Sequence, residues 1–208
     1  MLDPRIKTFI KGKDVFVDFG CGRGDILDAL VGRYRTLIGL DRYETRLKKR
    51  VTKTRGWTFI QSDLNQHFPL NSSSVDTAFA NQVIEHIADP RFFASEIYRV
   101  LKRQGVVIIT TPNIRYVKNL WRIVVKGRGP RTACDNQIDG PWDDGHLHYF
   151  THRDLREIFS EAGFSNVSSK GLVNIENGGL ARRLADRYSV DGPVREFLSG
   201  NILLIARK

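Results

Sequence analysis

The 208-residue sequence predicts an α/β fold in which a mostly parallel sheet carries helices on both faces. Short apolar runs typical of buried strands alternate with longer segments that have apolar residues at helical spacing. With 41% hydrophobic residues the chain can bury one core, and we find no linker, repeat or low-complexity segment that divides it. We therefore expect a single domain over residues 1–208.

The alternation of strands and helices fills the first half of the chain. The expected strands are VFVDF, TLIGL, WTFIQ, VDTAFA and GVVIIT, at 15–19, 36–40, 57–61, 75–80 and 105–110. Helices are expected between them, over 25–34, 43–54 and roughly 90–102. This order is typical of parallel strands joined by helical crossovers.

After the fifth strand the pattern changes. A basic amphipathic helix is expected over 114–126, and core packing explains its apolar stripe about as well as membrane docking does. A loop rich in Gly, Pro and Asp follows it and runs to about 149. Thr151 is expected to cap a further helix that Gly163 ends. The tail offers a short helix near 179–188 and a closing strand at 201–207.

The formal net charge of +10 is concentrated in one region. Residues 91–131 contain ten Arg or Lys and a single acid, Glu96. Such a region suggests an anionic partner such as nucleic acid, a membrane surface or a phosphorylated substrate, and the alternative is a solvated basic face with no partner. We expect a cytoplasmic protein, since no apolar run has membrane-spanning length, the N-terminus is charged, and Cys21 and Cys134 form no disulfide or metal pattern.

A glycine-rich turn follows the first strand. Asp18 stands near the end of that strand, and Gly20, Gly22 and Gly24 follow it. Glycine lets a ligand approach the backbone closely, and the carboxyl ends of parallel strands are where such folds bind ligands. The spacing is not that of a dinucleotide-binding turn, because the third glycine of G-x-G-x-x-G would fall on Asp25 or on Leu27.

Two more acids follow the second and third strands. Asp41, followed by Arg42, stands where a carboxylate can accept both hydroxyls of a ribose. Asp63, followed by Leu64, could accept a hydrogen bond from an adenine amino group. S-adenosylmethionine has no phosphate and carries a sulfonium cation, so three acids at three successive strand ends favour it as the cofactor.

The segments VFVDFGCGRG, IGLDRYE, FIQSDLNQ, VDTAFANQVIEHIADP and EIYRVLKRQGVVIITTPN resemble the ordered motifs of class I S-adenosylmethionine-dependent methyltransferases. The nearest group is the small bacterial type related to ubiquinone-biosynthesis O-methyltransferases. The resemblance covers about 13–164, and the closing strand NILLIAR resembles the family's last, antiparallel strand. It implies a Rossmann-like, seven-stranded sheet, Asn81 beside the cofactor, and a substrate cap inserted over 113–149, where Trp121 and Trp142 could line the acceptor pocket. A departure is LKRQG in place of the usual LKPGG.

Methyl transfer is an in-line displacement in which a general base helps when the acceptor is a hydroxyl or amine. We expect His86 or His146 to be that base, and His148 to pack within an aromatic cluster. Some relatives carry E-x-x-E-H and a later His that hold a divalent metal. Here Gln82 replaces the first Glu, so we expect no metal. The alternative is a metal held by Glu85, His86 and His146.

The function expected from these features is O-methylation of a small-molecule, sugar or lipid-linked acceptor. One alternative is nucleic-acid methylation, which the sequence pI near 9.9 favours. Against this alternative, the sequence shows no N-P-P-Y-type motif and no appended RNA-binding module. Another alternative is a non-enzymatic protein that binds S-adenosylmethionine, although a degenerate copy usually loses some of the three acids. The glycine spacing disfavours a nicotinamide oxidoreductase.

Overall fold

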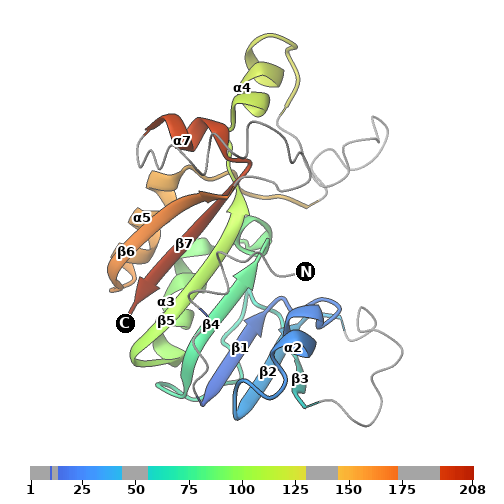
Figure 1. Cartoon of the computed structure of the whole chain (residues 1–208), viewed down its shortest axis with the longest axis vertical. Helices are drawn as coiled ribbons and strands as arrows, with labels where there is room; N and C mark the ends of the chain where they lie inside the picture. The colour runs from blue at the N-terminus through green and yellow to red at the C-terminus, as the bar shows by residue number, and fades with distance from the viewer. Residues whose placement is uncertain (1–9, 11–13, 44–55, 130–144, 173–192) are drawn as a thin grey trace.

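The computed structural model describes residues 10, 14–43, 56–129, 145–172 and 193–208, which include a seven-stranded sheet in the order β3-β2-β1-β4-β5-β7-β6 (Figure 1). Strands β1 to β5 pair in parallel, and β7 runs antiparallel to both β5 and β6. The predicted Rossmann-like sheet is therefore confirmed. The strands are β1 (Val15–Phe19), β2 (Thr36–Asp41), β3 (Thr58–Gln61), β4 (Val75–Asn81), β5 (Leu101–Pro112), β6 (Ser165–Leu172) and β7 (Asn201–Arg207).

Helices cover both faces of the sheet, as predicted. Helices α3 and α5 supply Phe93, Ile97, Leu155 and Phe159 to the larger apolar cluster, and α2 supplies Leu27 and Leu30 to the cluster on the opposite face. The described helices are α2 (Asp25–Leu30), the 3₁₀ turn η2 (Ile84–His86), α3 (Pro90–Val100), α4 (Val117–Val124), α5 (His152–Glu161) and α7 (Pro193–Leu198). No described helix has both the length and the apolar character needed to cross a membrane.

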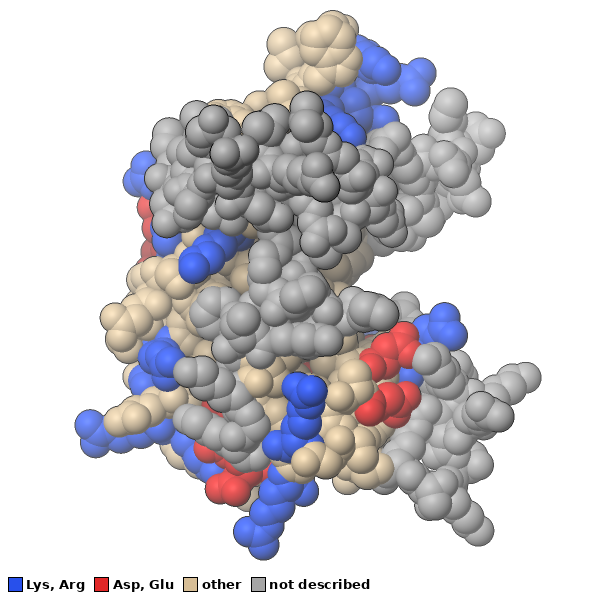
Figure 2. Space-filling model, viewed as in Figure 1, with Lys and Arg blue, Asp and Glu red and all other residues tan. Residues whose placement is uncertain are grey.

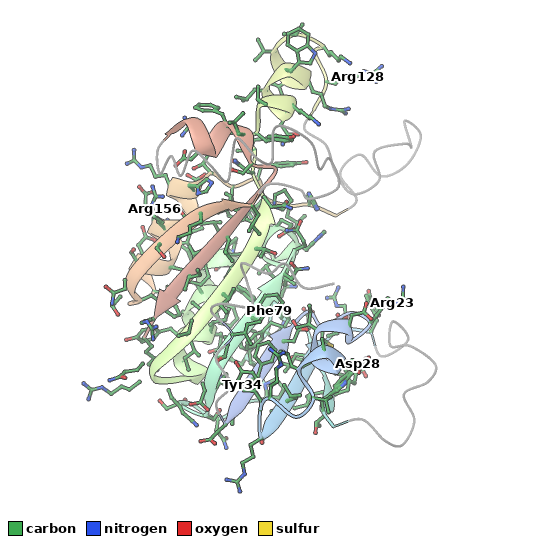
Figure 3. The ribbon with its side chains drawn as sticks, viewed as in Figure 1. Arg23, Asp28, Tyr34, Phe79, Arg128 and Arg156 are labelled. Atoms are coloured by element: carbon green, nitrogen blue, oxygen red, sulfur yellow. The ribbon has the colours of Figure 1, made fainter. Side chains whose placement is uncertain are left out.

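Aromatic rings fill the α2 side of the sheet. The Phe16 ring lies between those of Tyr34 and Phe79, with centroid separations of 5.1 and 6.1 Å. Tyr34 and Phe79 are seen at the lower part of the sheet in Figure 3. Asp28 on α2 also accepts a hydrogen bond from the indole nitrogen of Trp57 at 2.9 Å, which ties the helix to the start of β3.

Local signals account for the helix ends. Thr151 caps α5 in a reciprocal capping box with Asp154, and Gly163 beyond its end has φ +100°, as the sequence predicted. Helix α3 begins at Pro90, with the Asp89 carboxylate accepting from two backbone N–H groups. Helix α2 ends at Leu30, earlier than predicted, and Gly32 with φ +80° follows it.

Some elements differ from the prediction. Strand β5 begins at Leu101 rather than at residue 105, because Leu101 already pairs with Val75 before the register shifts. The elements η2 and α7 were not predicted, since segments of three and six residues carry too little periodicity to detect. The helices expected at 43–54 and 179–188 lie outside the described residues.

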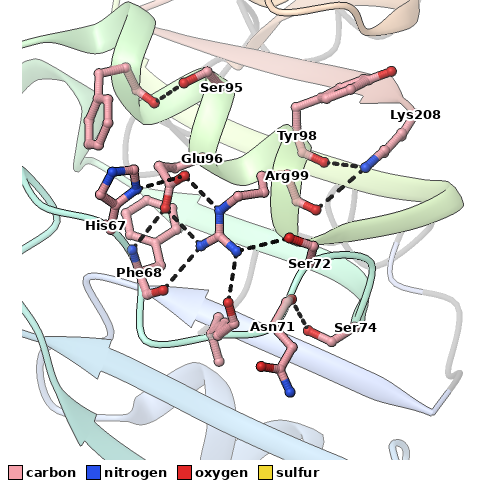
Figure 4. A network of polar contacts seen from close by, with 12 residues as sticks. His67, Phe68, Asn71, Ser72, Ser74, Ser95, Glu96, Tyr98, Arg99 and Lys208 are labelled. Atoms are coloured by element: carbon pink, nitrogen blue, oxygen red, sulfur yellow. Dashed lines mark hydrogen bonds and ion pairs between the residues drawn. The ribbon is translucent and has the colours of Figure 1, made fainter.

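A polar network joins α3 to the loop before β4 (Figure 4). The buried Glu96 carboxylate accepts from Arg99 at 2.7 and 2.8 Å and from the backbone N–H of Phe68 at 2.9 Å. Arg99 also donates to the carbonyls of Phe68 and Leu70. These bonds, those from Arg99 first, lower the pKa of Glu96 from its ordinary 4.5 to about 2. The network thus fixes the loop that leads into β4.

Replacing Glu96 by glutamine is expected to lower the free energy of unfolding by about 2–3 kcal/mol near pH 7, because Arg99 loses its counter-charge. The ionised carboxylate stabilises the fold above its unfolded pKa, and this contribution is lost as the pH falls toward the folded pKa of about 2. Denaturant unfolding at several pH values should show wild type and variant converging below about pH 4. The exposed Arg91–Glu161 pair supplies the control, since Glu161→Gln should cost less than about 1 kcal/mol. Equal stability of E96Q and wild type at pH 7 would contradict this role.

Candidate functional site

The predicted site residues gather at the carboxyl ends of β1, β2 and β4. These three strands are neighbours in the order β2-β1-β4, so the chain reverses its direction of travel across the sheet at β1. A crevice forms at such a point because the connections leave toward opposite faces. The glycine turn, Asp41 and the segment that follows Asn81 all begin there.

The turn after β1 depends on its glycines. Gly20, Gly22 and Gly24 have φ values of 74°, 51° and 76°, in the left-handed region that other residues rarely adopt. A Cβ at Gly20 would lie 2.5 Å from Cγ2 of Val83, so the segment after β4 packs directly on this turn. A Cβ at Gly22 would meet no atom within 4 Å, which leaves the backbone there open to a ligand.

Asp41 holds the turn through both carboxylate oxygens. Its Oδ2 accepts from the backbone N–H of Gly22 at 2.9 Å, and its Oδ1 accepts from the N–H of Tyr43 at 3.1 Å. The carboxylate is buried, and each oxygen keeps a second lone pair that could accept a hydroxyl.

Asp18 lies buried beneath the same turn. Burial raises the pKa of its carboxyl well above the ordinary value, and the nearby negative charge of Asp41 raises it further. Among the described residues no cation and no hydrogen bond lowers this pKa. A positively charged ligand group bound here would therefore favour the ionised form of Asp18.

Asp63 is already satisfied by its neighbours. Its Oδ1 accepts from the backbone N–H and side-chain amide of Asn65 at 3.0 and 2.9 Å, and its Oδ2 pairs with the Arg42 guanidinium. The backbone bond from Asn65 is the largest cause of its lowered pKa, and the bond from Arg42 contributes. A ligand amino group that used Asp63 would have to share it with Arg42, an ion pair that the sequence did not predict. Leu64 is buried beside it.

A second cluster forms where η2 meets residues 145–149. The buried Glu85 carboxylate accepts from the Thr111 hydroxyl at 2.9 Å, and burial raises the pKa of Glu85. The backbone carbonyl of Glu85 accepts from the N–H groups of Leu147 and His148 at 2.8 and 3.1 Å. These bonds bring the predicted histidines together, although they are 60 positions apart in the sequence.

His86 and His146 face one another across this contact. Their ring centroids lie 4.7 Å apart in an edge-to-face arrangement. His86 Nδ1 lies 2.9 Å from the carbonyl oxygen of Gly145. A carbonyl only accepts, so Nδ1 carries the proton and Nε2 of the neutral ring keeps its lone pair. His86 is exposed, so this nitrogen is a candidate proton acceptor, whereas His146 is buried.

The same residues could also bind a cation. Glu85, His86 and His146 each offer a ligand atom, all within 4.8 Å of one another. Ligand atoms about 2.1 Å from one ion lie at most about 4.2 Å apart, so the set fits a metal in kind but would have to close slightly. Gln82, in the position of the carboxylate found in metal-binding relatives, donates its side-chain amide to the Thr110 hydroxyl at 3.4 Å.

The set of predicted residues is completed by Asn81, His148 and the two tryptophans. Asn81 is exposed at the end of β4, and its side-chain oxygen accepts from the Thr110 hydroxyl at 2.6 Å. His148 lies against the Phe150 ring and bonds the Ala88 carbonyl, which agrees with the packing role expected for it. Of the two candidate cap tryptophans, Trp121 is exposed on α4, and Trp142 lies outside the described residues.

Sequence reasoning missed Thr110 and Thr111, which bond Asn81 and Glu85. A signal for them was present, since two adjacent hydroxyls directly follow the apolar run 106–109.

Comparison with known proteins identifies methyltransferases as relatives of this chain. A family model described as a methyltransferase domain matches residues 17–109. A probable S-adenosylmethionine-dependent methyltransferase of Mycolicibacterium smegmatis is 32% identical over 82% of this chain and 58% of its own length. A ubiquinone biosynthesis O-methyltransferase of Vibrio parahaemolyticus is 30% identical over 77% of this chain and 67% of its own. This chain spans only 55–58% of the length of the mycobacterial relatives that it matches.

Solved structures share the fold. An S-adenosylmethionine-dependent methyltransferase from Mesorhizobium loti superposes with a TM-score of 0.68 at 17% identity, over 99% of this chain and 96% of that one. A second such structure, from Archaeoglobus fulgidus, gives a TM-score of 0.66 at 20% identity, over 98% and 90%.

Proposed function

Because the chain belongs to the class I S-adenosylmethionine-dependent methyltransferases, we propose that it methylates an oxygen of a small-molecule, sugar or lipid-linked acceptor. The observation that carries the proposal is the His86 ring, whose Nδ1–H is held by the Gly145 carbonyl so that Nε2 can take a proton from the acceptor, which we take to be a hydroxyl. The O-methyltransferase of Vibrio parahaemolyticus among the relatives supports this choice. The two cysteines of this chain fit a cytoplasmic location.

The residues around the glycine turn fit the cofactor. S-adenosylmethionine supplies an electrophilic methyl group on a sulfonium cation. In our proposal the open backbone at Gly22 lets the cofactor approach, Asp41 accepts the ribose hydroxyls, and the buried Asp18 carboxyl ionises beside the cationic end of the cofactor. Asn81, Gly20, Gly24 and the Arg42–Asp63–Leu64 group would complete the pocket walls.

In the proposed reaction, Nε2 of His86 removes the proton from the acceptor hydroxyl as that oxygen forms a bond to the methyl carbon. Bound S-adenosylmethionine would supply the methyl carbon, and the electron pair of the broken carbon–sulfur bond would stay on sulfur, which would become a neutral thioether. Glu85 and His146 would orient His86, since the backbone of Glu85 holds the 145–149 segment in place. Glu85 and His146 would thus lower the barrier by positioning, and His86 would lower it by accepting the proton.

Binding of S-adenosylhomocysteine and S-adenosylmethionine, without binding of NAD, is the expected result of calorimetric titration. The affinity for S-adenosylmethionine should rise with pH, because burial raises the pKa of Asp18 and the bound cation favours its ionised form. Binding then releases a proton, and the affinity should level off once free Asp18 is ionised. Asp18→Asn is the control and should remove this pH dependence. Tight NAD binding, with no response to S-adenosylhomocysteine, would refute the cofactor assignment.

The acceptor would reach the site from the 113–149 side. We propose that this segment, of which 130–144 lie outside the described residues, caps the acceptor, because α4 follows β5 at the same edge of the sheet as the site. Helix α4 projects beyond that edge (Figure 1), and in our proposal either a lipid-linked or a soluble acceptor enters from this side.

A further inference from the structure

Helix α4 is amphipathic, but its burial is reversed. The most buried residue of the helix is the polar Asn119, whose amide donates to the Asn113 carbonyl at 2.9 Å. Large apolar side chains on the helix and just after it are exposed instead. Their exposed fractions are 47% for Val117, 56% for Trp121, 78% for Val124 and 56% for Val125.

These apolar residues form one face. Positions 117, 121, 124 and 125 follow the i, i+4, i+7, i+8 spacing that aligns side chains along a helix. The helix projects beyond the sheet at the carboxyl end of β5 (Figure 1). A contiguous exposed apolar face of this kind marks an interaction surface.

Positive charge flanks the apolar face. The segment 113–129 holds five basic residues and no acid. In Figure 2 the Lys and Arg side chains gather beside the helix at the top of the molecule, and Figure 3 places Arg128 at its outer end. Lys118, Lys126 and Arg128 form no ion pair within the described residues.

Much of the remaining basic region is neutralised within the fold. Four of its residues form ion pairs, namely Arg91 with Glu161, Arg99 with Glu96, Lys102 with Asp76 and Arg115 with Glu196. The basic residues that these ion pairs leave over include Lys118, Lys126 and Arg128 on and after α4, and the exposed Arg103 at the turn before Gly105.

We propose that α4 docks the protein on an anionic membrane surface, with the face Val117, Trp121, Val124 and Val125 inserted between headgroups and the basic flank against lipid phosphates. A second copy fits less well, since two such faces would bring their basic flanks together. Nucleic acid phosphates would bind the basic flank but would leave the apolar face of α4 exposed to water. The docking does not depend on methyl transfer, although it would turn the acceptor side toward a lipid-linked substrate.

Co-sedimentation with vesicles tests the docking. The full chain should bind vesicles of phosphatidylglycerol and phosphatidylcholine, bind pure phosphatidylcholine at least about tenfold more weakly, and lose affinity as salt is added. Trp121→Ser with Val124→Ser should weaken binding at least about tenfold, and so should Lys118→Glu with Lys126→Glu.

Matched surface changes elsewhere serve as controls. Val31 is as exposed as Val117, so Val31→Ser should leave vesicle binding unchanged, as should Arg33→Glu with Arg35→Glu. Equal binding to both kinds of vesicle, or binding that the α4 variants leave unchanged, would overturn the proposal. A fall in the sedimentation coefficient of the free protein in W121S/V124S would also overturn it, because a second copy would then cover the face.

Discussion

Replacing His86 by alanine is expected to lower the rate of methyl transfer by about 10²–10⁴-fold, with little change in cofactor affinity. The reason is that His86 is exposed at the site and the Gly145 carbonyl fixes its tautomer, so no other described histidine there offers an equally accessible lone pair. The measurement is single-turnover transfer from labelled S-adenosylmethionine to a matched acceptor. Added imidazole should restore part of the rate in H86A, as for a missing base.

His148 provides the matched control. It lies in the segment that holds His146, but it packs on Phe150 and bonds the Ala88 carbonyl. His148→Ala should therefore change the rate less than about tenfold, through small movements of the segment. A rate in H86A close to that of wild type would remove His86 from the mechanism.

Excess chelator distinguishes a base from a metal ligand. We expect the rate to persist in chelator, because Gln82 stands where metal-binding relatives have a carboxylate, and its amide is engaged with Thr110. If chelator abolished the reaction and Mg²⁺ or Zn²⁺ restored it, Glu85, His86 and His146 would be ligands. Imidazole would then fail to rescue H86A in the presence of chelator. If His86 is a general base, imidazole should rescue the variant whether or not chelator is present.

The sheet was predictable because each buried parallel strand is a short apolar run between turn residues. VFVDF and NILLIAR correspond to β1 and β7 residue for residue. The antiparallel direction of β7 came only from the family resemblance, since an isolated strand carries no sign of its direction. The short turn η2 escaped prediction because its three residues carry too little periodicity.

The candidate site was predictable where it follows strand ends. Asp18, Asp41 and Asn81 could be placed at one edge because parallel strands end together. The contacts between distant segments could not be placed. The approach of His146 to His86 depends on backbone bonds from 147 and 148 to the Glu85 carbonyl. The Arg42–Asp63 ion pair depends on the spacing of β2 and β3.

The sequence also could not predict that the apolar side chains of α4 are exposed and that Asn119 is buried. Spacing showed an amphipathic helix, and core packing explained its apolar stripe as well as membrane docking did. Only the exposed fractions of Trp121 and Val124 distinguish the two.

Replacing Asp41 by alanine is expected to weaken the binding of S-adenosylmethionine by about 1.5–3 kcal/mol, or about 10- to 150-fold in Kd. Two losses combine, because the carboxylate would accept the ribose hydroxyls and also holds the Gly22 and Tyr43 N–H groups. Asp41→Asn keeps one acceptor oxygen and should fall between alanine and wild type. Asp76 is the matched control, since it accepts from the Val15 N–H and pairs with Lys102 at the opposite edge of the sheet. D76A should lower the melting temperature and leave Kd unchanged, whereas an unchanged Kd in folded D41A would show that the cofactor does not use this carboxylate.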